Sequence, residues 1–244
     1  MKSMLGESLG STLVTSGGVI GDRTYAVRDP ATGRVLSTKR EAELFSCSAR
    51  LADANGAVTV TLPGGRELRI DDRALELELS QLLGRPVGIA RVGQDRKARV
   101  EIGETSATTE GPASEFSALP GTFFDSAEIH IVTTSSLAAL RALTPESEID
   151  GRRFRPNFVV SVGSDVDFVE ERWVGRQVLI GADLVLEVLK PCSRCVMVTL
   201  PQEELARDKS ILQTVARRND NNLGVLAKVI EGGRVEVGDE LRVV

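Results

Sequence analysis

Short strand-like segments separated by tight turns dominate the first third of this 244-residue chain. Residues 58–62 alternate between valine and threonine before a Pro-Gly-Gly turn, and residues 67–70 return. Residues 24–27 and 34–38 flank a second turn at 29–33, which contains Pro30. Alternation with a period of two is typical of strands that bury one face, and Pro and Gly supply the dihedral angles of turns. We therefore predict two β-hairpins.

The composition also favours a fold built from strands. Hydrophobic residues make up 41% of the chain, but aromatic residues only 4%. Its core must therefore rest on Val, Leu, Ile and Ala, which suit many short strands. We predict a mostly β fold with a few helices (α+β), whose first 90 or so residues form a β module.

Two segments show helical spacing. In residues 74–83 the leucines recur at the spacing of an amphipathic helix, which Gly84 closes. A second helix is predicted at residues 137–143, with Thr134 or Ser135 as its cap.

The remaining chain alternates between predicted strands and loops. Residues 103–121 are rich in Thr, Ser, Gly and Pro, which predicts a loop that could lie over a site. Residues 202–217 are predicted as helix or loop. Further strands are expected at residues 13–20 (two, around a turn), 128–133, 158–162, 178–188 (two), 196–200, 225–229 and 235–243.

Charge and cysteine content exclude several classes of protein. With 30 basic and 35 acidic residues, the net charge of −5 disfavours a nucleic-acid binder. No run approaches the roughly 18 apolar residues of a membrane span, and no secretory signal opens the chain. Three cysteines without disulfide-type spacing indicate a reducing compartment. We predict a cytoplasmic protein.

The segment Cys-Ser-Arg-Cys at residues 192–195 carries two of the three cysteines. A positive charge next to a cysteine stabilises the thiolate, so Arg194 favours the ionised form of its neighbour. A thiolate is a soft ligand for transition metals and also a nucleophile. The spacing predicts a metal site or a nucleophile and does not distinguish them.

Other interpretations of this cysteine pair remain open. Structural zinc needs about four ligands, and outside the pair the chain has only Cys47 and His130. We interpret His130 as a residue of an apolar strand and Cys47 as a small buried hydrophobe. A thioredoxin-like dithiol would begin a helix, whereas this pair precedes a predicted strand. A merely structural pair is the remaining alternative.

Two motifs in a fixed order suggest a family. Phe-Arg-Pro-Asn at residues 154–157 precedes a predicted strand, and Pro-Cys-Ser-Arg-Cys follows at residues 191–195. In this order they resemble the MOSC family, named for the C-terminal domain of molybdenum cofactor sulfurases. Lys2-Ser3 and residues 21–25 resemble the β-barrel module before MOSC in the branch with the mitochondrial amidoxime-reducing component and its bacterial relatives. The resemblance implies an N-terminal module at 1–90 packed on a MOSC β-barrel domain at 91–244.

The resemblance also implies a cofactor, molybdopterin carrying molybdenum, with the thiolate of Cys195 on the metal. Arginine and lysine side chains suit its phosphate, and an asparagine suits a pterin edge that both donates and accepts hydrogen bonds. Amides at a helix start would add donors for an anion. The residues that match cofactor contacts are Lys2, Ser3, Arg23, Thr134, Ser135, Ser136, Arg155, Asn157, Ser193 and Arg194.

The activity that the resemblance implies is a molybdenum-dependent oxidoreductase. It would reduce N-hydroxylated compounds or N-oxides, which are small molecules, by oxygen-atom transfer. One alternative is a sulfur carrier with a persulfide on Cys195, and another is a cofactor-binding protein without turnover. Sulfurases of this family carry a separate pyridoxal phosphate domain, and no such domain fits here, so pyridoxal phosphate binding is only a family label.

The electrons for such a reaction must come from elsewhere. An iron–sulfur cluster needs about four ligands, mostly cysteines, and this chain has three cysteines in all. No Gly-x-Gly-x-x-Gly stands between a predicted strand and a helix. We expect a separate donor protein, a flavin reductase with a ferredoxin-like domain. Because the family places a strand before Lys2, we also expect the natural chain to begin upstream of Met1.

Overall fold

The computed structural model describes residues 1–52, 57–93, 100–102, 114–116, 123–163 and 166–244. Most of the predicted loop at 103–121 therefore lies outside the described residues. The described residues divide into two units, one from within 1–8, 21–104 and 108–125 and the other from within 9–20 and 126–244. Strands predominate, with three α-helices among the described residues, so the predicted mostly β fold class is confirmed.

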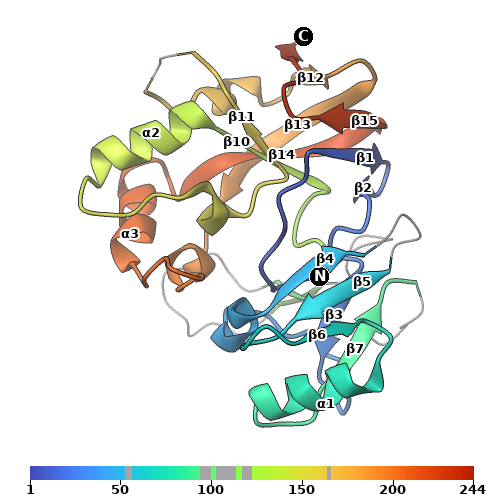
Figure 1. The fold of residues 1–244 in the computed structure, drawn as a ribbon. Helices are drawn as coiled ribbons and strands as arrows, with labels where there is room; N and C mark the ends of the chain where they lie inside the picture. The colour runs from blue at the N-terminus through green and yellow to red at the C-terminus, as the bar shows by residue number, and fades with distance from the viewer. Residues whose placement is uncertain (53–56, 94–99, 103–113, 117–122, 164–165) are drawn as a thin grey trace. The chain divides into compact units, whose positions relative to one another are not determined.

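A six-stranded sheet in the order β11-β10-β14-β13-β12-β16 forms the second unit's centre and curls as a half-barrel (Figure 1). Its strands are β10 (Ile129–Thr133), β11 (Phe158–Val160), β12 (Gln177–Ile180), β13 (Leu184–Ser193), β14 (Asn222–Glu231) and β16 (Leu241–Val243). Only the β10–β11 pair is parallel. The register between β13 and β14 shifts three times, and the last shift falls between Pro191 and Ser193. Such bulges bend a strand and re-aim its side chains.

A second, three-stranded sheet in the order β15-β1-β2 belongs to the same unit. It combines β1 (Ser11–Thr15) and β2 (Gly18–Val19) with β15 (Gly233–Glu236), from the far end of the chain. Buried valine, isoleucine and leucine side chains of both sheets form one cluster. This is the aliphatic core that the low aromatic content predicted.

Two helices cover another cluster of the second unit. Helix α2 (Thr134–Leu143) follows β10 directly, and α3 (Lys209–Arg218) follows a cap at Asp208. The predicted caps of α2 are wrong, because Thr133, still extended at the end of β10, accepts the Ser136 amide with its side chain. The strand predicted at 196–200 is also wrong. It is the 3₁₀ helix η4 (Val196–Thr199), where Val198 packs in the cluster of α2 and α3.

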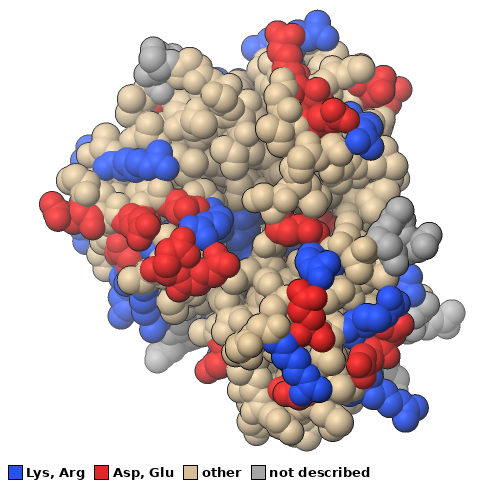
Figure 2. All heavy atoms as spheres, in the orientation of Figure 1, with Lys and Arg blue, Asp and Glu red and all other residues tan. Residues whose placement is uncertain are grey.

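Two further 3₁₀ helices of this unit matter for the site. Helix η2 (Gly151–Phe154) lies between α2 and β11, and η3 (Val169–Trp173) lies between β11 and β12. Surface charges are mixed in sign. On the face shown in Figure 2, basic and acidic side chains are interspersed. Among the ion pairs of the second unit, Arg152 pairs with Asp150 at 3.0 Å and with Glu203 at 2.6 Å.

The first unit contains the predicted hairpin at residues 58–70. Strands β4 (Ser48–Leu51), β5 (Val58–Thr61) and β6 (Glu67–Arg69) form an antiparallel sheet. Helix α1 (Arg73–Leu82) confirms the predicted helix, and Gly84 after it has φ +65°. Strands β8 (Val100–Ile102) and β9 (Ser114–Phe116) pair with each other, and η1 (Ala42–Ser46) precedes β4.

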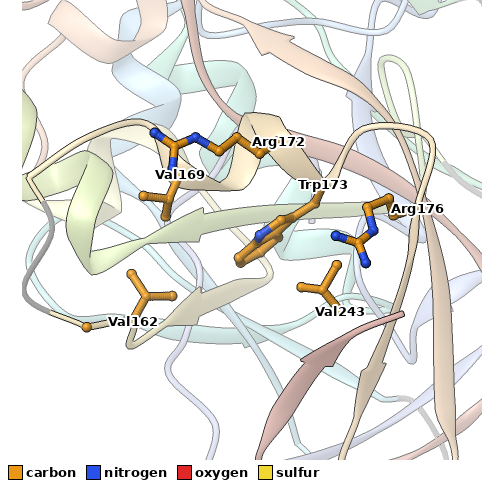
Figure 3. A pocket seen from close by; sticks show the side chains of 7 residues that line it. Val162, Val169, Arg172, Trp173, Arg176 and Val243 are labelled. Carbon is orange, nitrogen blue, oxygen red and sulfur yellow. The ribbon is translucent and has the colours of Figure 1, made fainter.

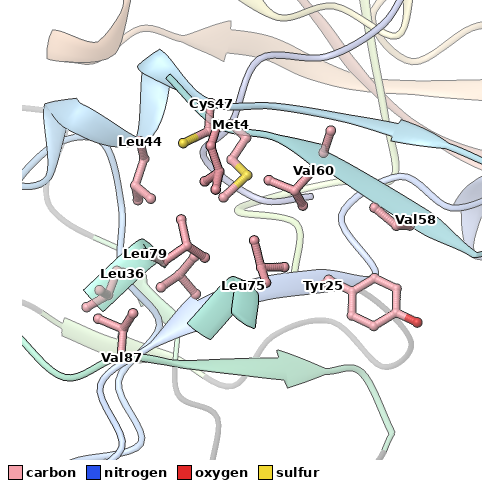
Figure 4. Packing of buried hydrophobic residues seen from close by; sticks show 13 residues of the cluster. Met4, Tyr25, Leu36, Leu44, Cys47, Val58, Val60, Leu75, Leu79 and Val87 are labelled. Atoms are coloured by element: carbon pink, nitrogen blue, oxygen red, sulfur yellow. The ribbon is translucent and has the colours of Figure 1, made fainter. Parts of the chain in front are cut away.

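The other predicted hairpin of this unit forms only in part. Strand β3 (Tyr25–Arg28) pairs with β7 (Gly88–Arg91). The segment predicted as its partner keeps the bridge of Arg28 with Val35 and two main-chain hydrogen bonds at 2.8 Å, from Leu36 to the Val27 carbonyl and from Asp29 to the Arg34 carbonyl. Leu75 and Leu79 of α1 are fully buried in the core that Figure 4 shows, together with residues of β3 and β5. Within the residues described, no helix is long and apolar enough to cross a lipid bilayer.

Candidate functional site

Arg194 is the centre of a buried polar cluster in the second unit. Its main-chain amide donates to the Asn221 carbonyl at 2.8 Å, directly after β13 ends. Nη1 donates to Sγ of Cys192 at 2.9 Å and lies 3.3 Å from Nε2 of His130. Nη2 donates to the Phe154 carbonyl at 2.8 Å. One guanidinium therefore connects β13, β10 and η2.

This cluster controls the pKa of the Cys192 thiol. Burial raises its pKa, but the Arg194 guanidinium and then His130 outweigh burial and lower the pKa to about 6. Cys192 also packs with Ala127 and Leu226 in a small apolar cluster. At neutral pH this buried side chain is mainly a thiolate that faces a cation.

Asn157 holds β10 rather than leaving its side-chain oxygen free for a ligand. Oδ1 accepts the His130 amide at 2.9 Å, and the Asn157 amide donates to the His130 carbonyl at 2.8 Å. On the other side, Nε2 of His130 lies 3.4 Å from the Leu223 carbonyl. The Phe-Arg-Pro-Asn motif is thereby joined to the strand that carries His130.

Cys195 differs from Cys192 in its surroundings. It is a free cysteine, partly exposed, and it caps η4 in an extended conformation. Asn221 supports the segment before it, with Nδ2 donating to the Arg194 carbonyl at 2.7 Å and to Oγ of Ser193 at 3.1 Å. An accessible thiol, rather than a buried one, is what an incoming metal requires.

Positive φ angles occur at several predicted site residues. Arg155, after η2, has φ +54°, and in the first unit Ser3 has φ +65° and Arg23 has φ +50°. Asn221, which supports the cysteine segment, has φ +63°. Side chains other than glycine rarely adopt this conformation, and it persists mainly where the surroundings impose it, often at functional sites.

The start of α2 is occupied by the protein's own groups. The buried carboxylate of Glu170, on η3, accepts from Thr133 at 2.7 Å and from Ser136 at 2.6 Å through Oε2. The Ser135 hydroxyl donates to the Asp167 carbonyl at 2.7 Å, and Thr134 accepts the amide of residue 162 at 3.3 Å. The three residues predicted as cofactor contacts here thus all have protein partners in this structure.

Two predicted contacts of the first unit, Lys2 and Arg23, lie at residues 123–125. Lys2 is buried, and its Nζ donates to the Phe123 carbonyl at 2.9 Å and to Asp125 at 2.6 Å. Burial lowers the pKa of Lys2, which Asp125 only partly offsets. Arg23 bonds Asp22 at 3.2 Å, and its guanidinium lies 5.2 Å from the centre of the Phe124 ring. Two cations therefore lie close together in this unit.

An open depression of about 430 Å³ lies elsewhere on the second unit, around Trp173 (Figure 3). Arg172 and Arg176 flank the indole, with Val169 of η3 and Val243 of β16. None of the residues predicted as cofactor contacts lines it.

Two residues escaped the sequence analysis as functional candidates: His130, which lies beside Arg194, and Glu170, which binds the start of α2. The contact of Cys192 with Arg194 also went unpredicted, although residues two positions apart in an extended chain share a face. His130 carried no comparable signal, because its place beside Arg194 depends on the order of β10, β14 and β13. Glu170 was missed because η3 meets the start of α2 only in the tertiary structure.

A curled sheet with a thiol-bearing segment at the end of a bulged strand defines the class of this protein. The MOSC domain profile matches residues 119–242, and the chain belongs to the MOSC domain family. The family is associated with molybdenum cofactor binding.

Three solved structures are similar at low identity. YuaD from Bacillus subtilis is 13% identical, with a TM-score of 0.47, over 97% of this chain and 86% of that one. YiiM from Geobacillus stearothermophilus is 16% identical, with a TM-score of 0.37, over 48% of this chain and 54% of that one. YiiM from Escherichia coli is 15% identical, with a TM-score of 0.36, and 54% of that chain is again covered. The match thus spans about half of each YiiM chain. A search of curated proteins found no significant match.

Proposed function

We propose that this protein binds a molybdenum cofactor through Cys195 and reduces N-hydroxylated compounds or N-oxides. The observation that carries the proposal is the placement of Cys195, a free and partly exposed thiol directly after Arg194. Arg194 joins the cysteine segment to the Phe154 carbonyl, and so brings the two family motifs together in the second unit.

The residues present fit such a cofactor. Cys195 offers one soft ligand, which suits molybdenum. Arg155 stands next to the Phe154 carbonyl that Arg194 holds, and a guanidinium is well suited to a phosphate. Nε of Arg194, which is buried, has no hydrogen-bond partner among the described residues.

Each residue has a defined task in this proposal. When bound, the cofactor would supply two-electron oxygen-atom transfer. Cys195 holds the metal, and Arg155 compensates negative charge on the cofactor. Asn157 and Arg194 hold the main chain on either side of these groups, so that both stay oriented. Orientation of this kind is the protein's main contribution where a cofactor carries the chemistry.

The test compares Cys195→Ser with Cys47→Ser, produced in a host that makes molybdenum cofactor. Cys47 is a buried thiol of the first unit and serves as the matched control. We expect Cys195→Ser to lose bound molybdenum and viologen-driven reduction of an amidoxime, because a neutral hydroxyl replaces the soft thiolate. Cys47→Ser should keep its molybdenum per folded protein. Full molybdenum content in Cys195→Ser would refute the proposal.

We also propose a separate electron-donor protein, a flavin reductase with a ferredoxin-like domain. Three cysteines, one of them assigned to the metal, are too few for an iron–sulfur cluster. The molybdenum-loaded protein should turn over with NADH only when such a reductase is added. Steady turnover with NADH alone would contradict this part.

Sulfur transfer with a persulfide on Cys195 is the second candidate, and the free, partly exposed thiol of this residue favours it. A thiolate at neutral pH can accept sulfur from a small persulfide donor, leaving the donor as a thiol. Mass spectrometry after such treatment would show one added sulfur on the cysteine segment. Stoichiometric molybdenum with no added sulfur would favour the oxidoreductase instead.

A further inference from the structure

The buried Arg194 guanidinium needs a negative charge nearby. Both Arg194 and Cys192 are only 9% exposed. An isolated buried cation is costly, and such groups are normally paired. Its described partners are a thiol, an imidazole and a main-chain carbonyl, supplied by Cys192, His130 and Phe154. Of these three groups, only the thiol can become an anion.

The same guanidinium connects the two segments that the proposed function uses. The carbonyl it holds belongs to Phe154, the residue before Arg155. Its own main chain precedes Cys195 and is fixed to Asn221 through both its amide and its carbonyl. If Arg194 turned toward water to find a counter-ion, the Phe154 carbonyl would lose its donor. The main chain at Arg155 and the main chain at Cys195 would then no longer be joined through the Arg194 side chain.

We propose that Cys192 is a positioning residue of this site. Its thiolate is the buried counter-ion that keeps Arg194 on the Phe154 carbonyl, and so keeps Arg155 and Cys195 arranged for the cofactor. The cofactor part of this inference rests on the proposed function, whereas the ion pair itself does not. Cys195 remains the ligand, and Cys192 acts through Arg194.

If Cys192 acted only through packing, its size would matter and its charge would not. The side chain touches Ala127 and Leu226, and a small neutral residue would fill that space equally well. Charge and shape can therefore be separated by substitution. Cys192→Ser keeps the size and loses the charge, whereas Cys192→Asp keeps a negative charge and adds bulk. The carboxylate in the second variant can accept the same Nη1 donor.

The first experiment uses protein without cofactor and measures the pair directly. Urea unfolding is followed for the wild type, Cys192→Ser, Arg194→Met and the double variant. Each single change leaves one buried partner uncompensated, so both should lower the urea midpoint. The urea midpoint of the double variant should fall by clearly less than the sum of the decreases in the two single variants. Additive losses would overturn the ion pair and with it the proposal.

The second experiment measures molybdenum per folded protein in cofactor-loaded samples, with Cys47→Ser as the control. We expect Cys192→Ser to lose several-fold in occupancy and Cys192→Asp to recover most of it. Occupancy better in Cys192→Ser than in Cys192→Asp would overturn the charge role. Should Cys192→Asp not fold, the unfolding cycle and the occupancy of Cys192→Ser decide, and full occupancy in Cys192→Ser would overturn the proposal.

The two experiments separate this inference from the proposed function. A wild-type protein without molybdenum would refute the proposed function, while the unfolding cycle would still report on the pair. A third outcome would refute only the positioning role. In that outcome the unfolding cycle shows coupling, the wild type binds molybdenum, and Cys192→Ser binds as much molybdenum as the wild type.

Discussion

Asn157 and His130 are joined by two hydrogen bonds. The His130 amide donates to the Asn157 side-chain oxygen at 2.9 Å, and the Asn157 amide donates to the His130 carbonyl at 2.8 Å. The pair extends the parallel contact of β10 and β11, which begins one residue later with Ile131 opposite Phe158. The conformation of the Phe-Arg-Pro-Asn motif is therefore coupled to the strand that supplies His130.

Replacing Asn157 tests this coupling. We expect Asn157→Ala to lower the free energy of unfolding of the cofactor-free protein by about 1–3 kcal/mol, because the His130 amide loses its acceptor. Urea denaturation measures the change. Asn222→Ala is a suitable control, since the bond that its side chain donates to the Asp220 carbonyl, at 3.1 Å, is exposed to solvent. A wild-type midpoint for Asn157→Ala would show that this bond contributes nothing.

The stability of the protein should depend on pH through Cys192. Its pKa is about 6 in the folded protein against an ordinary value of 9.0. Between these values the unfolded chain holds a proton that the folded protein has released, so the free energy of unfolding rises with pH, by up to about 1.4 kcal/mol per unit. This contribution is complete above pH 9 and is lost as the pH falls through about 6. Comparing wild type with Cys192→Ser isolates it, and parallel curves would contradict it.

The hydroxyl of Ser136 should matter for folding even without a cofactor. It donates to the buried Glu170, whose other oxygen, Oε1, has no hydrogen-bond partner among the described residues. Ser136→Ala would leave the carboxyl group with fewer donors and should cost about 1–3 kcal/mol of stability. Ser147→Ala, an exposed hydroxyl change in the same unit, should cost much less. Equal midpoints for both variants would argue against a structural bond to Glu170.

Gly224 is required where β14 passes His130. It has φ +79°, and a Cβ there would lie 2.5 Å from Nε2 of His130 and 2.6 Å from the Ile131 carbonyl oxygen. Gly224→Ala should therefore destabilise the protein by about 2 kcal/mol or more, and should disturb the Arg194 cluster. Thermal unfolding measures the first effect.

Gly238 provides the control for Gly224, since it has φ +101° but no atom within 4 Å of an added Cβ. Gly238→Ala tests backbone strain without a clash and should cost only about 1 kcal/mol. Equal losses in the two variants would assign the effect at Gly224 to strain alone.

Much of the local structure could be predicted from the sequence. The hairpin at residues 58–70 and helix α1 follow from periodicity and from their turn or cap residues. The cysteine segment and the Phe-Arg-Pro-Asn motif also stand out without a structure, and the match over residues 119–242 confirms the family. The residues predicted to contact the cofactor remain predictions.

Local patterns failed where two elements compete for the same residues. The segment predicted as a strand at 34–38 keeps only a short pairing with β3, around the bridge of Arg28 with Val35, whereas β3 pairs along its length with β7, about 60 residues later in the chain. The valine-rich run at 196–200 had the composition of a strand and forms η4, since tertiary packing of Val198 beside α2 and α3 overrides β propensity.

The sequence by itself determined which residues of the cysteine segment can carry chemistry: one cysteine pair and the arginine between them. Only the tertiary structure decided that Arg194 lies on Cys192 and next to His130, 64 residues away. Periodicity and capping are set by interactions within a few residues, so a sequence reveals them. The charge of a buried thiol depends on strands that meet only after the sheet has formed, because the pairing of distant strands is selected by the packing of the whole core.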